Sequence, residues 1–197
     1  MDSTRYWIER YANGGNSGAG SSGNLNIFKS EYLNSIIQKY RIESVLDFGC
    51  GQGAILEFLD VNKYLGFDPS PEVIKFLRQE YATDSTKEFQ YNTETLESKE
   101  LVISFDVIFH LIEDAVYENY MKSMFSFSTK YVLIYSSNTN RTDLEYATAP
   151  HVKHRIFQKD IPREFSLLEQ HQNLFPYSSD NPEQTSWSDF YLYVKNG

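Results

Sequence analysis

The sequence predicts an α/β fold, in which a mostly parallel β-sheet carries helices on both faces and ends in an antiparallel hairpin. Between residues 28 and 135, short apolar segments typical of buried strands alternate with segments whose apolar residues recur at helical spacing. After residue 135 this alternation stops. Two strand-like segments, 164–171 and 190–195, follow one another without a helix signal between them, and an antiparallel hairpin is the economical arrangement for such a pair.

The expected elements begin with an N-terminal part that has no apolar periodicity after residue 11. Residues 6–11 are aromatic and charged, and residues 13–24 contain only Asn, Gly, Ser and Ala, so this loop should be mobile unless something orders it. An amphipathic helix is expected over 28–40, with Lys29 away from its apolar positions.

A strand–turn–helix unit follows, with a buried strand over 45–48 and a helix over 54–59. Next comes a strand over 64–67 and a helix from Pro71 to about Tyr81, which begins with a capping serine and an acidic first turn. The remaining elements are a weak strand near Phe89, a strong strand over 101–107, a helix over 114–127, a strand over 131–135 and a hairpin loop over 176–188.

Length and composition limit the class of protein. A chain of 197 residues with 41% apolar residues is expected to form one domain with a sizeable core. Its 18 basic and 27 acidic residues give a net charge of −9, which opposes binding to DNA or RNA.

The expected location is a reducing cytoplasm, because the single cysteine, Cys50, has no partner for an internal disulfide and the first 20 residues are charged. No membrane span is expected. The longest apolar stretch, 101–112, is interrupted by Asp106 and His110 and falls short of the roughly 20 residues that a span requires.

The turn after the first expected strand carries Gly49, Gly51 and Gly53. Glycines between a strand and a helix let the backbone approach a ligand closely, beside the unpaired amides of a helix N-terminus. Asp47 precedes this turn, and Asp68 ends the next strand, where a carboxylate can accept two hydrogen bonds from a ribose diol. These residues indicate a nucleotide-like ligand, and both NAD and S-adenosylmethionine fit them.

Three features favour S-adenosylmethionine over NAD. The carboxylate of Asp47 suits a sulfonium or ammonium ligand and repels a pyrophosphate. The chain has little room for the separate catalytic region of an NAD enzyme, and it ends in the hairpin described above.

The segment 45–53, Val-Leu-Asp-Phe-Gly-Cys-Gly-Gln-Gly, resembles the first motif of class I S-adenosylmethionine-dependent methyltransferases, and the resemblance extends over residues 42–135. It implies a Rossmann-like, seven-stranded sheet with one antiparallel strand. It also implies that Asp47, Gly49 and Gly51 line the methionine part of the cofactor. The segment from Glu100 to Leu111 is similar to the family's fourth strand, with Glu100 where Asp is usual.

The N-terminal segment is expected to fold over the cofactor as a lid, or else to be a disordered terminus. Asn92 and Thr93 are candidates for contact with the adenine. The full set of expected cofactor-binding residues is Asp47, Gly49, Gly51, Gly53, Asp68, Phe105, Asp106, Tyr6, Arg10 and Gly18.

His110 follows the fourth strand at the ligand-binding edge and is a candidate base for a hydroxyl acceptor, or else a structural histidine. His154 is the second candidate and lies in the basic segment 151–155, which can bind an anionic acceptor or be a solvated loop. The expected acceptor-binding residues are Ser136, Asn138, His151 and Arg155. Asp106, His110 and Asp114 have the spacing of a metal site, but the pattern is common and no metal is expected.

The segments 14–18, 136–139 and 151–155 more loosely resemble small bacterial methyltransferases of surface-polysaccharide and capsule modification. This resemblance implies O-methylation of a sugar or nucleotide-linked precursor, including phosphoramidate-type groups. The chain is then one domain, with a lid over 1–27, a cofactor-binding core over 28–135, and an acceptor loop and hairpin over 136–197. The alternatives are an NAD-linked oxidoreductase and a non-catalytic module that binds adenosylmethionine.

Overall fold

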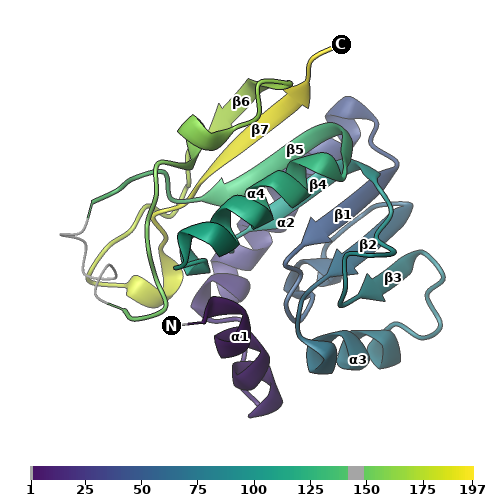
Figure 1. Cartoon of the computed structure of the whole chain (residues 1–197), viewed down its shortest axis with the longest axis horizontal. Coiled ribbons are helices and arrows are strands. Elements are labelled where there is room, and N and C mark those ends of the chain that lie inside the picture. Colours follow the sequence, from purple (N-terminus) through teal and green to yellow (C-terminus); the bar gives the residue numbers. More distant parts are fainter. Residues whose placement is uncertain (1, 142–148) are drawn as a thin grey trace.

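The computed structural model describes residues 2–141 and 149–197 and has one seven-stranded sheet of order β3-β2-β1-β4-β5-β7-β6 (Figure 1). Strands β1 to β5 pair in parallel, whereas β7 is antiparallel to both β5 and β6. The strands are β1 Ser44–Phe48, β2 Lys63–Phe67, β3 Lys87–Gln90, β4 Lys99–Phe105, β5 Ser128–Ser136, β6 Phe165–His171 and β7 Asp189–Lys195. The predicted fold class is confirmed.

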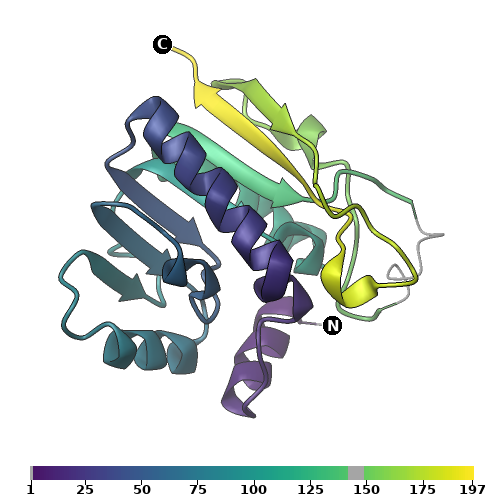
Figure 2. The same cartoon turned by 180° about the vertical axis from the view of Figure 1, so that it is seen from behind.

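Helices cover both faces of the sheet. The α-helices are α1 Ser3–Ala12, α2 Gly23–Tyr40, α3 Pro71–Glu80 and α4 Asp114–Ser126. Helix α4 crosses one face and α2 crosses the other, as the two opposite views show (Figures 1 and 2). Neighbouring strand residues point to opposite faces, so Val45 joins the apolar core under α2 while Leu46 joins the core under α4.

The predicted helix over 54–59 is wrong in type, because the structure has only a 3₁₀ turn at Ala54–Glu57. Asn34 of α2 explains the early end of this turn. Its side-chain amide donates to the carbonyl oxygen of Phe58 at 2.7 Å, and its side-chain oxygen accepts from the amide of Asp60 at 3.0 Å. The chain is thereby directed into β2 after a single turn.

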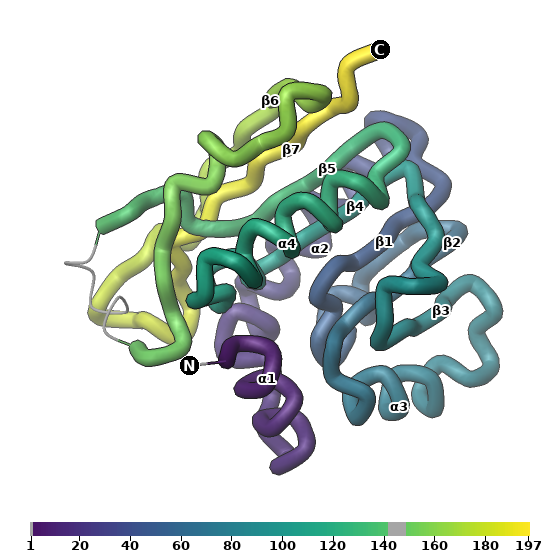
Figure 3. The backbone as a smooth tube through the Cα atoms, in the orientation of Figure 1, coloured from purple at the N-terminus to yellow at the C-terminus, as the bar shows by residue number. Residues whose placement is uncertain are grey.

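The N-terminal part is more ordered than the sequence indicates. Asp2 caps α1 by accepting from the amide of Arg5 at 2.8 Å, and the predicted mobile loop continues into a 3₁₀ turn at Ala19–Ser21 and the first turn of α2. Contacts with the rest of the chain order this loop, including a hydrogen bond from the amide of Ser17 to the side chain of Gln52 at 3.2 Å. The backbone trace places α1 beside the carboxyl ends of the parallel strands (Figure 3).

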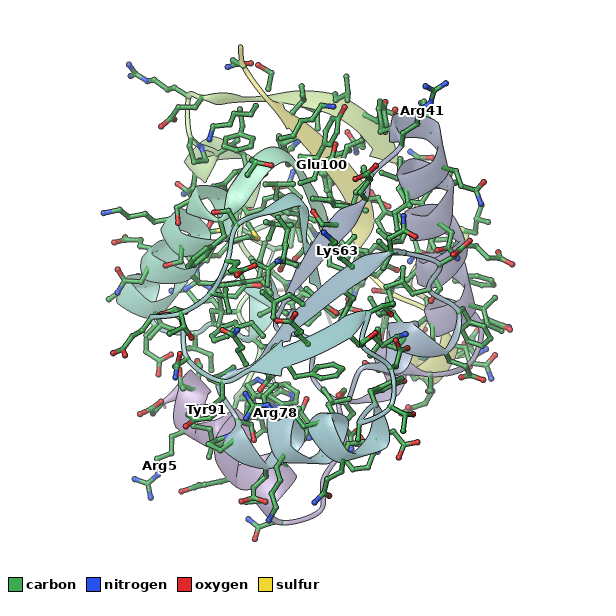
Figure 4. All side chains as sticks on the ribbon, turned by 90° about the vertical axis from the view of Figure 1, so that its right-hand side faces the viewer. Arg5, Arg41, Lys63, Arg78, Tyr91 and Glu100 are labelled. Atoms are coloured by element: carbon green, nitrogen blue, oxygen red, sulfur yellow. The ribbon has the colours of Figure 1, made fainter. Side chains whose placement is uncertain are left out.

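The two ends of the sheet carry different groups. Lys63 and Glu100 lie at the amino ends of β2 and β4, whereas Arg78 and Tyr91 lie at the opposite end (Figure 4). Arg78 fastens α3 to the sheet edge by donating to the carbonyl oxygen of Phe89 at 2.7 and 2.9 Å. α/β sheets bind ligands at the carboxyl ends of their parallel strands. Glu100 lies at the opposite end of the sheet. Within the described residues, no helix is both long and apolar enough to cross a membrane.

Candidate functional site

A cavity of about 290 Å³ opens at the carboxyl edge of β1, β2 and β4. Its walls come from α1, the loop before α2, α2 itself, the glycine turn after β1 and the segments that follow β2 and β4. Among the described residues that line it, the charged side chains are three carboxylates and one ammonium group: Asp47, Asp68, Asp106 and Lys29. This cavity is therefore suited to a ligand with positive charge.

The glycine turn requires glycine at Gly49 and Gly51. Both have positive φ angles, +101° and +50°, and a Cβ atom would lie 2.6 Å from Val107 at Gly49 and 2.7 Å from the hydroxyl oxygen of Ser17 at Gly51. Gly53 does not line the cavity. A Cβ there would lie 2.9 Å from Leu56 and Leu77, so this glycine serves close packing behind the turn.

The amide groups of the turn already donate hydrogen bonds within the protein. Those of Gly49 and Cys50 donate to the carbonyl oxygen of Phe67 at 2.7 and 2.9 Å. The amide of Gly51 donates to Asp68 at 3.1 Å, and that of Gln52 to the hydroxyl of Ser17 at 3.3 Å. The turn thus differs from a phosphate-binding loop, whose amides are left free for the anion.

Burial perturbs the two carboxylates beside the turn. It raises the pKa of Asp47 to about 7, against the opposing effect of the hydrogen bond that Tyr64 donates at 2.8 Å. It also raises the pKa of Asp68 to about 6, although Asp68 accepts from the amides of Gly51 and Ser70 at 3.1 and 3.0 Å. A ligand that donates hydrogen bonds or carries positive charge would stabilise the ionised form of both carboxylates.

Asp106, at the end of β4, takes a left-handed conformation with φ +58° and forms an ion pair with Lys29 at 2.7 Å. It also accepts from the hydroxyl of Ser188 at 3.2 Å. Lys29 is only 3% exposed, so its expected place on the polar part of the helix is wrong. The signal was present in the sequence, because Lys29 lies four residues from the buried Leu25 and Leu33 and shares their side of the helix.

His110 lies in a 3₁₀ turn after β4 and lines the cavity. Its Nδ1 is 3.0 Å from the carbonyl oxygen of His151. Since a carbonyl oxygen only accepts, Nδ1 carries the proton, and Nε2 is left as an acceptor. Burial lowers the pKa of His110 to about 4, so the ring is neutral near pH 7.

Aromatic rings of α1 pack around His110. The ring of Trp7 lies edge-on at 4.9 Å from it, and Tyr6 stacks on His151, which in turn stacks on His110 at 5.5 Å. Trp7 and Tyr11 line the cavity, although neither is among the residues expected there from the sequence. The expected lid residues Tyr6 and Arg10 bond to each other at 3.0 Å outside the cavity lining.

The other expected cofactor contacts divide into two groups. Phe105, Asp106 and Thr93 line the cavity, whereas Gly18 and Asn92 do not. Gly18 instead takes a φ of +89° just before the 3₁₀ turn at Ala19–Ser21, a conformation that shapes the loop over the site.

None of the expected acceptor residues lines this cavity. Arg155 is 9% exposed and donates to the carbonyl oxygens of Leu111 and Ile112 at 2.6 and 2.8 Å, and to Asp114 at 2.8 Å. These bonds hold the segment 151–155 against the chain that follows β4, and the acceptor role of Arg155 stays a prediction from the sequence.

The remaining expected residues near the end of β5 are Ser136, its last residue, and Asn138 and His154, which follow it in the chain. His154 Nδ1 lies 2.6 Å from the hydroxyl of Ser137, and Asn138 bonds to Gln158. Ser136 is fully buried. The acceptor role of these residues and of His151, and the catalytic role of His154, stay predictions from the sequence.

The spacing of Asp106, His110 and Asp114 does not produce a metal site in the described part of the chain, where no three potential metal ligands cluster. Asp114 instead pairs with Lys153 at 2.6 Å as well as with Arg155, and these contacts lower its pKa to about 2.

Comparisons with known proteins agree with this geometry. Residues 46–115 match the family model of a methyltransferase domain. The fold is similar to that of the N-methyltransferase NodS from Bradyrhizobium japonicum WM9, solved with S-adenosyl-L-homocysteine, with a TM-score of 0.72 and 15% identity over 100% of this chain and 99% of NodS. No curated protein matches the sequence at a significant level.

Two further solved structures share the fold. Magnesium protoporphyrin IX methyltransferase (ChlM) from Synechocystis PCC 6803, solved with bound S-adenosylmethionine, has a TM-score of 0.62 and 12% identity over 100% of this chain and 98% of that chain. An S-adenosylmethionine-dependent methyltransferase from Clostridium acetobutylicum ATCC 824 has a TM-score of 0.62 and 13% identity, over 85% and 91% of the two chains. The methyltransferase fold that the sequence predicts is thereby confirmed.

Proposed function

We propose that the chain is an S-adenosylmethionine-dependent methyltransferase that acts on a small polar acceptor at oxygen. The observation that carries this proposal is the charge of the cavity, in which carboxylates outnumber the one ammonium group and the amides of the glycine turn are occupied. A dinucleotide would bring a diphosphate to this acidic turn without free amides to bind it. A ligand with a sulfonium and an ammonium group matches it.

S-adenosylmethionine as the cofactor is also supported by the methyltransferase domain match over residues 46–115 and by similar structures solved with this compound or its demethylated product. The described residues fit it. Asp68, at the end of β2, would accept from the ribose hydroxyls, and Asp47 would face the positively charged part. Bound in this way, the cofactor supplies an electrophilic methyl group on a sulfonium.

His110 would remove the proton from the acceptor hydroxyl. It is neutral near pH 7, and the bond from Nδ1 to the carbonyl oxygen of His151 leaves Nε2 as the accepting atom; a pKa of about 4 makes this atom a weaker base than a free imidazole, so the proposed role depends on close alignment with the acceptor hydroxyl. The edge contact of Trp7 with the half-buried ring of His110 would let α1 exclude water while the acceptor is aligned with the methyl group.

The acceptor is proposed to be small and polar. The side chains of Thr4, Asn119 and Ser123 line the same cavity and provide hydrogen-bonding groups for a hydroxylated molecule. A sugar or a nucleotide-linked precursor of capsule or surface polysaccharide, including phosphoramidate-type groups, stays a prediction from the sequence resemblance.

Two measurements test the proposal. Calorimetry should detect binding of S-adenosylmethionine and S-adenosylhomocysteine and no binding of NAD. Single-turnover assays with methyl-labelled S-adenosylmethionine should transfer label to a hydroxylated acceptor. Binding of NAD alone would favour the oxidoreductase alternative, whereas cofactor binding without transfer to a broad acceptor panel would favour a non-catalytic module.

A further inference from the structure

The guanidinium of Arg10, in α1, is held by neutral oxygen atoms. Its Nε donates to the carbonyl oxygen of Asn16 at 2.7 Å, its Nη1 to the hydroxyl of Tyr6 at 3.0 Å and its Nη2 to the side-chain oxygen of Asn16 at 3.4 Å. No carboxylate of the described residues forms an ion pair with it. Because a guanidinium has five N–H donors, Arg10 keeps donors for an external acceptor, in a chain whose net charge is −9.

The loop after α1 fixes the position of this arginine. The amide of Gly15 donates to the carbonyl oxygen of Arg10 at 2.8 Å. A Cβ atom at Gly15 would lie 2.7 Å from Cγ of Arg10, so the loop closes against the arginine stem only with glycine at this position. On another side, the ring of Trp7 lies 5.3 Å from the guanidinium carbon. An arginine held in this way loses little conformational entropy when it binds a ligand.

Arg10 lies beside the imidazole rings at the rim of the cavity. The ring of Trp7, which lines the cavity, is 5.3 Å from the guanidinium carbon and 4.9 Å from the ring of His110. Tyr6, which accepts the hydrogen bond from Arg10, stacks on His151 at 5.2 Å. Burial and then the positive charge of Arg10 lower the pKa of His151. The guanidinium is therefore separated from His110 by one indole ring and is near His151.

The distribution of charge favours an anion at this rim over an anion inside the cavity. In the described lining, three carboxylates outnumber one ammonium group, so a negatively charged group is repelled there. At the rim, the planar guanidinium matches the oxygens of a phosphate or a carboxylate, both of which accept parallel N–H bonds. An acceptor that approaches His110 would therefore keep a negatively charged group outside, at Arg10.

We propose that Arg10 binds an oxyanion of the methyl acceptor, so that the substrate is a small hydroxylated molecule that also carries a phosphate or a carboxylate. The place of the acceptor hydroxyl at His110 rests on the proposed function. The anion site at Arg10 does not depend on it and is measured separately. Arg10 is then a residue that selects the acceptor, and it holds the acceptor by the end remote from the reacting hydroxyl.

The test titrates glycerol, glycerol phosphate and glycerate, which share a hydroxylated skeleton and differ in charge, into isotope-labelled protein with and without S-adenosylhomocysteine. NMR follows the side-chain N–H signals of Arg10 and Trp7. The anionic probes should shift both signals, and neutral glycerol should shift neither.

Arg10→Met, followed at Trp7, should bind the anionic probes roughly 10- to 100-fold more weakly, the range of charge-assisted hydrogen bonds. Its affinity for S-adenosylhomocysteine should be unchanged. Arg5→Met is the matched control, because Arg5 lies on the same helix and pairs with Glu9 at the surface, and it should bind the anionic probes as the unaltered protein does.

The outcomes separate the two proposals. A response to glycerol phosphate alone or to glycerate alone supports the site and identifies the oxyanion. The site is overturned if neither anion shifts the Arg10 signal, if glycerol binds as well as the anions, or if Arg10→Met and Arg5→Met have the same affinity for the anions. Loss of S-adenosylhomocysteine binding in Arg10→Met would assign Arg10 to the cofactor instead. If the anions bind at Arg10 and the unaltered protein does not bind S-adenosylhomocysteine, the proposed function fails and the anion site stands.

Discussion

The glycine turn after β1 lines the same cavity as His110, and the segment 151–155 contacts His110 through His151; the polar groups of these two regions are used in opposite ways. Beside the turn, the carboxylates of Asp47 and Asp68 are buried, with raised pKa values, and line the cavity. In the segment 151–155, the guanidinium of Arg155 donates hydrogen bonds to the carbonyl oxygens of Leu111 and Ile112 and to the carboxylate of Asp114. Asp47 and Asp68 accept one and two hydrogen bonds within the protein and keep acceptor capacity for a ligand, because a carboxylate offers about four lone-pair sites.

His110 lines the cavity with the glycine turn and bonds to His151 of the segment 151–155. Its removal should have the largest effect on the rate of methyl transfer. The ring belongs to the cavity, but the carbonyl oxygen of His151 sets its tautomer. We expect His110→Ala to lower the single-turnover rate of methyl transfer by about 10²- to 10⁴-fold, the range for a general base, with little change in cofactor affinity.

His154→Ala is the matched control for this loss, because His154 pairs with Ser137 and does not line the cavity. Its transfer rate should stay within about tenfold of the unaltered protein. A comparable loss in both variants would return the base role to His154, and a normal rate in His110→Ala would leave His110 a structural residue.

Arg155→Ala tests the structural side of the comparison. The substitution leaves the carbonyl oxygens of Leu111 and Ile112 without their donor, so the free energy of unfolding in urea should fall by about 3 kcal/mol. Cofactor affinity of the folded protein should be unchanged. Lys153→Ala, which removes an exposed partner of the same Asp114, should cost about 1 kcal/mol or less. An Arg155→Ala protein that kept its stability and lost only acceptor binding would contradict a structural role for Arg155.

Asp68→Ala tests the ligand-binding side. Loss of the hydrogen bonds to the ribose should weaken cofactor binding by about 1–3 kcal/mol in calorimetry. Asp84→Ala is the control, since Asp84 makes its bonds to Thr86 and Lys87 in a surface turn. Equal cofactor affinity in the Asp68 variant and the control would remove Asp68 from the site.

The buried carboxylates also predict a pH dependence of binding. With a pKa of about 7, Asp47 is mostly protonated at pH 6 and mostly ionised at pH 8 in the ligand-free protein. A cationic ligand favours the ionised form, so its affinity should rise about tenfold over this interval, with release of protons on binding. Asp47→Asn should flatten the rise, and an affinity independent of pH in the unaltered protein would argue against a cation beside Asp47.

The stability of the ligand-free protein should show the opposite trend. Burial places the pKa of Asp47 above that of an unfolded aspartate, about 3.9, so the folded state binds more protons between these two values. The contribution of this group therefore weakens as pH rises from about 4 to about 7. Thermal unfolding of the unaltered protein and of Asp47→Asn across this interval measures the difference.

The same contrast explains what the sequence could reveal. The mostly parallel sheet with helices on both faces and the C-terminal hairpin were predictable because the alternation of strands and helices is a local pattern. Asp47 and Asp68 could be singled out by their places beside a glycine turn and at a strand end, and their role toward a cofactor stays a prediction. The partners of Arg155 and the ion pair of Lys29 with Asp106 depend on contacts between segments far apart in the chain. Local patterns place a charged residue on a helix or strand, but they do not show whether a distant segment forms an ion pair or hydrogen bonds with it.

The smallest expected effect concerns the two tryptophans, Trp7 in α1 and Trp187 in the loop before β7. Trp7 lines the cavity, whereas Trp187 stacks on Tyr177 at 4.3 Å in the C-terminal loop, outside the described lining. Trp7→Phe should abolish the change in tryptophan emission that cofactor binding produces and weaken affinity by less than about 1 kcal/mol, since an aromatic ring is retained. Trp187→Phe should keep the signal. If Trp187 carried the emission change instead, the ligand would act on the C-terminal loop, and α1 would not be the element that closes over it.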